Sequence, residues 1–427
     1  MFKILLICVV TIPLLYNGLI FTAVNKSGYI YNPNIPFSFK ILKDVVVLTA
    51  IFIPLLSHHV RKRLKMPGFF LLYIFFSTSV ALTMCAIAII KYDIDLRLLG
   101  ILKNYLVYYP ASGVLALLVN HYKKEKYFFN IFRLSMFLVL LLGLLFYFIA
   151  KTDFTFTFSG RMISLLGNPN YLSYLSMLYI FVLFGFIYFQ SRISFLITFE
   201  LIIAHLGLFL SFSYTSIPCY SVALIIMFII WYLELMPKNK LLIKIIIMAI
   251  FNSAIGSLAV FLTKYFRGGI FSVAFEQKVE PLSKVNITEL PFVQSRISTF
   301  HMSIAEIFSS LESFLFGTFH AKEYIENPSA FLNLAFNFGM PVLTAWLVYF
   351  IVPIFFVAAS FKKIRTSEDF NAGMTFMLSI LITCSLLIYF WVQYLPEKFP
   401  TCFFIGFVLS YILINALQLK CTNETVK

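Results

Sequence analysis

The stretch YLSYLSMLYIFVLFGFIYF (residues 171–189) contains no charged side chain and is almost entirely apolar or aromatic. A helix needs about 20 predominantly apolar residues to cross the hydrocarbon core of a bilayer. Because the membrane interior offers no water to backbone N–H and C=O groups, a segment of this kind crosses it as a helix. The stretch therefore predicts a membrane-spanning helix over residues 171–189.

The same pattern recurs along the chain. Apolar residues make up 61% of the sequence and charged residues 12%, which is about half of the charged share in soluble domains. We therefore expect an all-α polytopic membrane protein with about 12 transmembrane helices. The predicted spans are 3–24, 41–58, 67–90, 99–119, 128–150, 171–189, 194–212, 217–236, 242–263, 331–358, 371–393 and 400–418.

The first of these segments has some features of a signal peptide, because Lys3 precedes a long apolar run. The run is longer than a typical signal core, and no small-x-small cleavage site follows it at 22–25. We expect it to be a retained first span.

Short basic loops alternate with the predicted spans and set the orientation. Loops of this kind face the cytoplasm, so both termini are expected inside, in a bacterial inner membrane. The net charge of +15 then reflects topology and attraction to anionic lipids, and no nucleic acid is expected as a partner. The basic residues are Arg61, Lys62, Arg63, Lys65, Lys123, Lys124, Lys126, Arg192, Lys238, Lys240, Lys362, Lys363 and Arg365.

Two outer segments are long, 151–170 and 264–330. The predicted organisation is one integral membrane domain, with spans one to nine in 1–263, a large periplasmic loop over 264–330 and spans ten to twelve in 331–427. A loop confined to one side favours an enzyme on the outer face over a transporter that rocks between two access states. A weak inverted repeat could still escape a single sequence.

The large loop contains a predicted amphipathic helix from Arg296 to Phe316, which Gly317 ends. Two placements stay open: on the bilayer surface with the apolar face down, or packed on the outer ends of the spans. The apolar positions are Ile297, Phe300, Ile304, Ile307, Leu311 and Phe314 or Leu315, and the polar face carries Arg296, Ser303, Glu306 and Ser313.

Three arginines of the outer segments are candidate site residues: Arg161, Arg267 and Arg296. The guanidinium group is a planar fork that binds phosphate through two parallel hydrogen bonds and stays charged when partly buried. Several such groups on the outer face suit a pyrophosphate at the membrane surface. The alternative is that each arginine contacts lipid phosphates. Asn168 and Asn170 follow Arg161 and are candidate substrate contacts or turn residues.

Carboxylates and histidines supply the remaining candidates. Glu306 and Glu326 are possible general bases for a sugar hydroxyl, and His301 is a possible substrate contact or a packed residue. Glu200 and His205 lie in one predicted span and are candidate functional residues. For Glu200 the favoured interpretation is a polar interhelical contact or a place at the cytoplasmic interface. The sequence carries no nucleotide-binding, metalloprotease or nucleophile-elbow motif and no carboxylate-metal cluster. No metal or cofactor is expected, and a sugar donor would be carried by lipid.

Several of these segments resemble the O-antigen polymerase and ligase superfamily. The string RMISLLGNPNYLSYL (161–175) resembles the periplasmic loop and following span of that family, and SFSYTS (211–216) resembles its S-x-S-R-x-x turn, with Tyr214 in place of the usual arginine. The helix 296–317 and the string NPSAFLNL (327–334) with Gly339 resemble two further motifs. The matches cover about 50 residues in motif and most of the chain in topology.

The resemblance implies a GT-C-like membrane glycosyltransferase without a cofactor. Pro328 and Ser329 occupy the family's His-Asn positions, which favours the Wzy-type polymerases over the ligases. The implied partners are an undecaprenyl-pyrophosphate-linked oligosaccharide, membrane lipids and a chain-length regulator. The missing histidine leaves the general base unassigned. The predicted catalytic residues are Arg161 and Arg296, with Glu306 as a candidate base from the carboxylates of the large loop. A ligase acting on lipid A core, a lipid-linked oligosaccharide flippase and a non-catalytic assembly factor remain the alternatives.

Overall fold

The computed structural model describes residues 2–24, 37–57, 68–91, 103–150, 162, 164–166, 168–213, 215–267, 291–317, 329–390 and 400–421. These residues form helices and the turns between them, and none of them lies in a β-strand. The predicted all-α class is therefore confirmed for the described part of the chain. The chain folds as two compact units, Met1–Leu64 with Val119–Ser283 and Lys362–Leu381, and Lys65–Leu118 with Lys284–Phe361 and Ile382–Lys427.

Six helices in the described residues are long and apolar enough to cross a membrane, which supports the predicted multi-pass class. Shorter apolar helices accompany them, so the number of twelve spans and the predicted loop boundaries stay predictions. The six are Glu125–Phe148, Pro169–Gln190, Asn239–Leu262, Met340–Ala359, Phe370–Tyr389 and Thr401–Leu419, and the shorter ones are Phe2–Leu15, Gly68–Met84, Leu106–His121, Phe195–Leu210 and Ser216–Tyr232.

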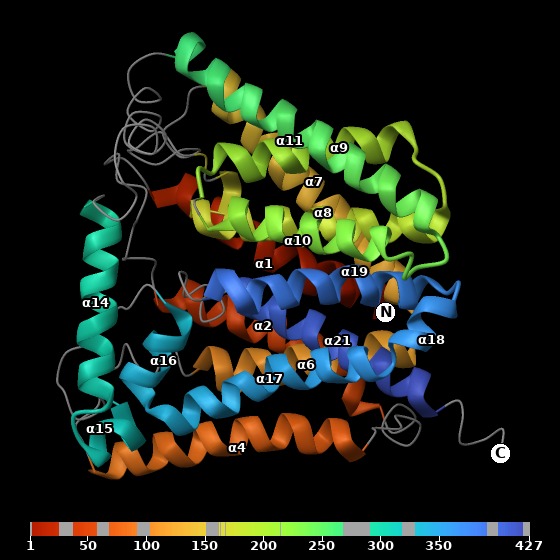
Figure 1. Ribbon diagram of the computed structural model, residues 1–427. Coiled ribbons are helices and arrows are strands. Elements are labelled where there is room, and N and C mark those ends of the chain that lie inside the picture. Colours follow the sequence, from red (N-terminus) through yellow and green to blue (C-terminus); the bar gives the residue numbers. More distant parts are fainter. Residues whose placement is uncertain are drawn as a thin grey trace. The chain divides into compact units, whose positions relative to one another are not determined.

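The first unit is built around α8 (Pro169–Gln190), the helix that contains the stretch 171–189 (Figure 1). Every residue of α8 from Leu172 to Tyr188 is buried, as expected for a helix that is apolar on all sides. The helix contacts α7, α9, α10 and α11. The other elements of this unit are α1 (Phe2–Val24), α2 (Phe37–Leu56), α7 (Glu125–Leu145), η2 (Phe146–Ala150), η4 (Ser164–Leu166), α9 (Phe195–Leu210), α10 (Ser216–Tyr232), α11 (Asn239–Arg267), α18 (Phe361–Thr366) and most of α19 (Phe370–Cys384).

By contrast, α11 exposes large apolar side chains along one face, among them Ile247, Ile250 and Phe251. Continuous apolar exposure on a long helix is unfavourable in water and suits contact with lipid tails. Its other face packs against α9 and α10. The first unit therefore has a buried central helix and an outer helix that fits a lipid environment.

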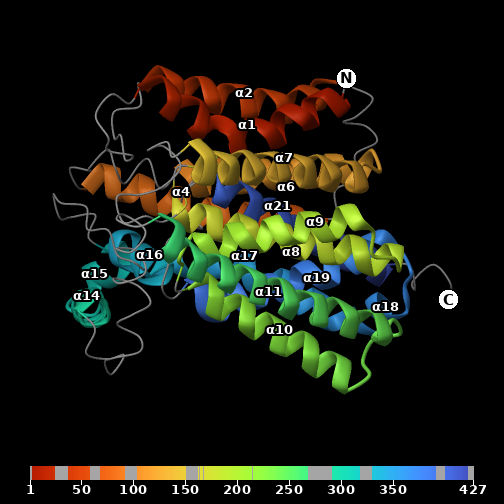
Figure 2. The same ribbon diagram turned by 90° about the horizontal axis from the view of Figure 1, so that it is seen from above.

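The second unit is organised by α17 (Met340–Ala359), which packs against α4 (Gly68–Lys91), α16 (Ala330–Phe338) and α21 (Thr401–Cys421). Helix α14 (Pro291–Ile307) lies roughly perpendicular to α4 and α17, on the side of the unit where these two helices end (Figures 1 and 2). It contacts α16 and α15. The remaining elements of this unit are η1 (Asn104–Tyr108), most of α6 (Tyr109–His121), α15 (Leu311–Phe316) and η7 (Ser385–Tyr389).

The predicted span 331–358 is wrong as one continuous helix, because Gly339 separates α16 from α17 with a φ of 86°. The predicted helix from Arg296 to Phe316 is likewise interrupted. Helix α14 ends at Ile307, and Ser310 begins α15 by accepting a hydrogen bond from the Ser313 N–H at 3.0 Å. The predicted stop at Gly317 is confirmed, with a φ of 62°.

The predicted division of this region into an apolar and a polar face is also partly wrong. Ser303 and Ser313, expected on the polar face, are buried. The apolar Ile304 and Leu311 are exposed, which agrees with the placement of the apolar face on the bilayer surface. The buried Ile307 and Ser303 lie one turn apart on α14, the helix that contacts α16. Small hydroxyl side chains allow close helix packing, and this outweighs the match between polarity and exposure.

The two helix-ending glycines pack their backbones directly against each other. A Cβ added at Gly317 would lie 2.5 Å from the Phe336 carbonyl oxygen and 2.7 Å from the Gly339 nitrogen. A Cβ at Gly339 would lie 2.8 Å from the Phe316 nitrogen. Both glycines also have φ and ψ values that only glycine adopts without strain. The contact between the ends of α15 and α16 therefore requires glycine at both positions.

We predict that Gly317→Ala and Gly339→Ala each lower the thermal stability of the purified protein, by about 1–3 kcal/mol from backbone strain alone. The matched control is Gly68→Ala at the start of α4, where an added Cβ meets no atom within 4 Å. The melting temperature of each variant in detergent is measured by heating samples and quantifying the remaining folded protein by size-exclusion chromatography. Equal melting temperatures for all three variants would contradict the proposed backbone contact.

Candidate functional site

Two of the segments that carry the family resemblance meet at one end of the first unit. The backbone N–H of Met162 donates to the carbonyl of Leu210 at 2.9 Å. The Ser164 hydroxyl donates to the Val139 carbonyl at 2.7 Å and attaches η4 to α7. Met162 of the first segment is thus bonded to the residue just before the second segment, near the start of α8.

A chain of buried serine hydroxyls strengthens this contact. Ser213 and Ser216 lie 3.0 Å apart, and Ser216 donates to Ser173 at 2.7 Å. Ser173 then donates to the Asn170 carbonyl at 2.9 Å. Each hydroxyl can donate one hydrogen bond to the next oxygen in the same direction. The chain therefore runs from the start of α10 to the start of α8 with every hydroxyl hydrogen-bonded. These serines hold two loops in register, a role that sequence analysis did not assign to Ser173.

The predicted contacts Asn168 and Asn170 form the beginning of α8. Asn168 is the N-cap, and its side chain accepts a hydrogen bond from the Asn170 N–H at 2.8 Å. Pro169 at the first helical position fits this role because its missing N–H would have no partner there. Both asparagines are half-buried. The role of turn residues therefore explains the hydrogen bond between Asn168 Oδ1 and the Asn170 backbone. Contact of either asparagine side chain with a substrate stays a prediction.

The remaining predicted residues lie in or beside the large loop. Glu306 and His301 are exposed on α14. Arg296 lies on the same helix, about two turns before Ser303, and Arg267 is the last residue of α11 in the first unit. Arg161 and Glu326 lie outside the described residues. The structure thus brings the motif segments 161–175 and 211–216 together, while convergence of the arginines stays a prediction.

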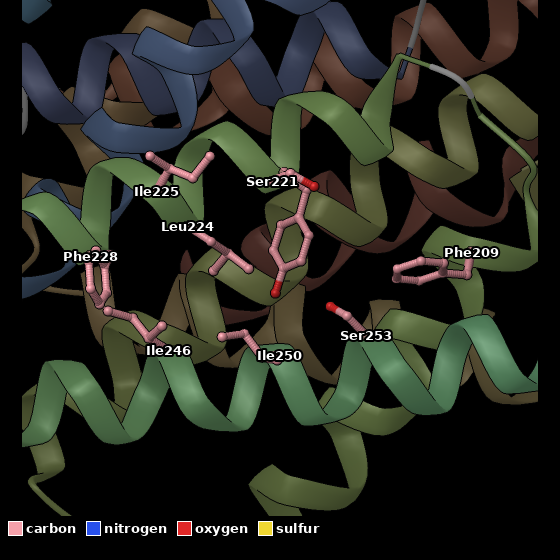
Figure 3. A pocket seen from close by; sticks show the side chains of 9 residues that line it. Phe209, Ser221, Leu224, Ile225, Phe228, Ile246, Ile250 and Ser253 are labelled. Carbon is pink, nitrogen blue, oxygen red and sulfur yellow. The ribbon is translucent and has the colours of Figure 1, made fainter.

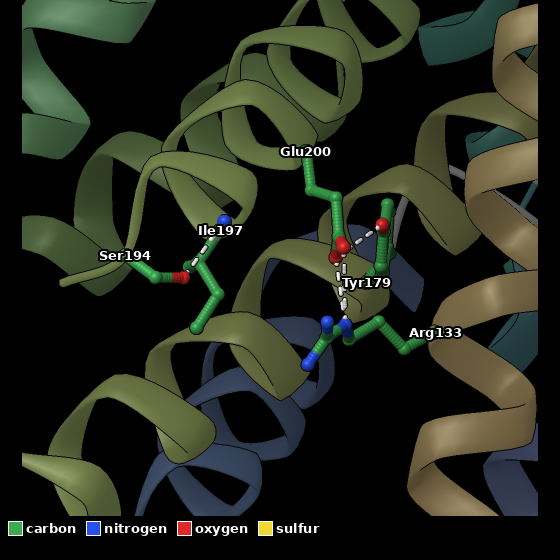
Figure 4. Close-up of polar contacts among 5 residues, drawn as sticks. All are labelled: Arg133, Tyr179, Ser194, Ile197 and Glu200. Atoms are coloured by element: carbon green, nitrogen blue, oxygen red, sulfur yellow. Dashed lines mark hydrogen bonds and ion pairs between the residues drawn. The ribbon is translucent and has the colours of Figure 1, made fainter. Parts of the chain in front are cut away.

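A second polar cluster joins three helices of the first unit (Figure 4). Arg133 of α7 pairs with Glu200 of α9, with 2.8 Å between Nε and Oε2. The Tyr179 hydroxyl of α8 donates to the same Oε2 at 2.9 Å. The Arg133 guanidinium also lies over the Phe186 ring, 5.4 Å from its centroid, a favourable cation–π geometry.

The cluster confirms that Glu200 makes a polar interhelical contact. Its partner Arg133 was not among the residues predicted from the sequence, although the sequence carries a signal for it. Arg133 is an isolated charge in the predicted span 128–150, as Glu200 is in 194–212, and opposite charges inside a membrane protein usually pair. With the carboxylate bound on both sides, the arrangement is suited to fixing α7, α8 and α9 and not to accepting a substrate proton.

No family model matches the chain, and no curated protein sequence matches it.

We predict that Arg133→Met and Glu200→Met each destabilise the protein. Arg133→Met should cost more, about 3–5 kcal/mol, because it leaves the buried Glu200 carboxylate uncompensated, whereas Arg133 is half-buried. The double variant Arg133→Met/Glu200→Met should recover most of the loss, since it removes both charges and keeps apolar volume. Thermal melting of the four proteins gives the coupling energy.

Glu234→Gln is the matched control, because Glu234 is an exposed carboxylate after α10. It should melt like the unmodified protein. If both single variants also melt like the unmodified protein, the ion pair does not hold the three helices together.

Proposed function

We propose that this chain is a membrane glycosyltransferase that polymerises oligosaccharide repeat units into O-antigen or a related surface polysaccharide. The donor is a growing glycan on undecaprenyl pyrophosphate, and the acceptor is a hydroxyl of a new lipid-linked unit. The reaction takes place on the periplasmic face of the bacterial inner membrane. A chain-length regulator is the expected protein partner.

The meeting of segments 161–175 and 211–216 is the observation that carries the proposal. Ser216 of one motif donates to Ser173 of the other, so residues of both motifs are in direct contact, as a site built from both motifs requires. The orientation of helix α14 adds support. It lies roughly perpendicular to α4 and α17 on the side where they end, and a helix so placed beside membrane-spanning helices is suited to the headgroup region. Arg296 belongs to this helix.

The chemistry explains why arginines are the proposed catalytic groups. The acceptor hydroxyl attacks the anomeric carbon and forms a new C–O bond, while the bond between that carbon and the pyrophosphate oxygen breaks. The lipid pyrophosphate leaves with the electron pair, and a base takes the hydroxyl proton; Glu306 and Glu326 are the candidates. Fixed cations stabilise the developing negative charge, and Arg161, Arg267 and Arg296 are proposed to supply them without a metal.

Deleting the gene should leave the surface glycan capped with at most one repeat unit, because single units still reach the outer face but are not joined. Gel electrophoresis of the lipopolysaccharide measures this. A ligase deletion would instead leave bare core with lipid-linked polymer. A flippase deletion would leave bare core with single units inside the cell. A normal polymer ladder would contradict all three functions.

Arg296→Lys should impair polymerisation at a normal protein level, because lysine keeps the charge but loses the planar fork. Arg296→Ala should be worse, by on the order of a hundredfold in rate, as for removal of a donor aimed at developing charge. Arg161 should behave alike. Ladder length and membrane protein level are measured together.

Arg192→Ala is the control, since Arg192 is exposed in the short turn between α8 and α9, on the predicted cytoplasmic side. It should leave the ladder unchanged. A full-length ladder with Arg296→Ala at normal expression would mean that this arginine only contacts lipid.

A further inference from the structure

Helix α11 presents two lysines at the start of an apolar face. Lys240 and Lys244 are both exposed and lie one turn apart, so they share one side of the helix. Ile247, Phe251 and Leu258 continue the same side, and each of them is more than half exposed. The face is therefore cationic where α11 begins and apolar along the rest of the helix.

The other sides of α11 are turned toward the protein. Ala249 and Gly256 lie on the side opposite the two lysines and are buried. Ile246 and Ile250 lie on a third side, where they line a groove between α10 and α11 (Figure 3). The lysine-bearing face is thus separate from both, and its own charges and apolar side chains decide what can cover it.

The positive charge at this end of α11 is not compensated by the residues that the structure describes. Among them, neither Lys240 nor Lys244 forms an ion pair with a carboxylate. Helix α11 contains no acidic residue, and Glu234, the nearest carboxylate in the sequence, precedes Lys240 by six positions. Like charges one turn apart repel each other, and cations near the start of a helix oppose its dipole. An anion bound between the two lysines would remove both unfavourable effects.

The lysines lie at the depth where lipid headgroups are expected beside a spanning helix. The candidate span Asn239–Leu262 has 24 residues. This is about 36 Å of helix, against a hydrocarbon core of about 30 Å. Lys240 is then level with the headgroups, and Lys244, about 6 Å further along the axis, reaches them with its long side chain. The apolar side chains from Ile247 onward follow at the depth of the acyl chains.

We propose that this face of α11 binds an anionic phospholipid, with its phosphate between Lys240 and Lys244 and an acyl chain along Ile247 and Phe251. The phosphate supplies the negative charge that this end of the helix lacks. An acidic protein segment or a nucleic acid would supply charge but leave the apolar side chains uncovered. A phospholipid with an ammonium headgroup would place a further cation beside the two lysines. The site is independent of the proposed glycosyltransferase activity and is tested without it.

The test uses the purified full-length protein in phosphatidylcholine nanodiscs that contain a small fraction of phosphatidylglycerol with a mid-chain diazirine. Irradiation should label the α11 peptide 245–264, which carries the apolar part of the face. Unlabelled phosphatidylglycerol should compete at a much lower concentration than phosphatidylethanolamine with the same acyl chains. Equal competition by the two lipids would overturn the proposal. Equal competition by free glycerol 3-phosphate would also overturn it, since the site would then recognise phosphate without a lipid.

Variants of the two lysines test the headgroup contact. Lys240→Gln/Lys244→Gln should lower the affinity for phosphatidylglycerol about thirtyfold, because each basic residue near an anionic membrane contributes about fivefold. Lys240→Arg/Lys244→Arg keeps both charges and should be labelled like the unmodified protein. All of these side chains are exposed, so the variants should melt at the temperature of the unmodified protein. Unchanged labelling in the glutamine variant would overturn the site.

The matched control is Lys362→Gln/Arg365→Gln on α18, which removes the same two charges from exposed positions on the predicted cytoplasmic side. Glu368 and Asp369 follow Arg365 by three and four positions, so carboxylates are close by in the sequence there. This control should be labelled on the α11 peptide like the unmodified protein. An equal loss of labelling in the control would mean that the lipid responds to total charge, and this would overturn the site on α11.

Discussion

The structure depends on one constraint: in apolar surroundings every backbone and side-chain polar group needs a partner within the chain. Helices satisfy the backbone internally, which is why the described residues form helices throughout. Side chains meet the constraint in different ways. The charges of Arg133 and Glu200 neutralise each other, and the hydroxyls from Ser213 to Ser173 form a directed chain that ends at a backbone carbonyl. These contacts decide which helices of the first unit lie together.

In the second unit the same constraint acts at helix ends. The last carbonyls of α15 and α16 cannot be left unpaired in a packed interior, so both helices end at glycines whose N–H groups bond back into the last turn. With no Cβ, Gly317 and Gly339 also let the two ends touch. Helix α16 is therefore separated from α17, although most residues on both sides of Gly339 are apolar.

This difference explains what the sequence could and could not predict. Apolar runs such as 171–189 predict long helices correctly, because composition and length decide them. A break inside an apolar run depends on a contact with a distant segment, and Gly339 alone does not reveal Leu315 or Phe316. The exposure of Ile304 and the burial of Ser303 are likewise decided by the partner helix α16. For the candidate site, single charges within spans indicated that partners exist, but only the fold identifies Arg133 and Tyr179 as the partners of Glu200.

Polar groups inside the first unit fall into two classes, and the distinction bears on function. The Glu200 carboxylate is bound by Arg133 and Tyr179 from two helices, so it is already satisfied. Asn252 of α11 has the opposite environment: its side chain is buried, and neither of its polar atoms has a hydrogen-bond partner among the described residues. Both side chains are polar and lie buried within apolar helices, the usual reason for suspecting function in a membrane protein. Burial alone therefore does not separate structural from functional polar groups. The hydrogen-bond partners do, since a group that the chain leaves unpaired keeps a hydrogen-bonding capacity that a ligand can use.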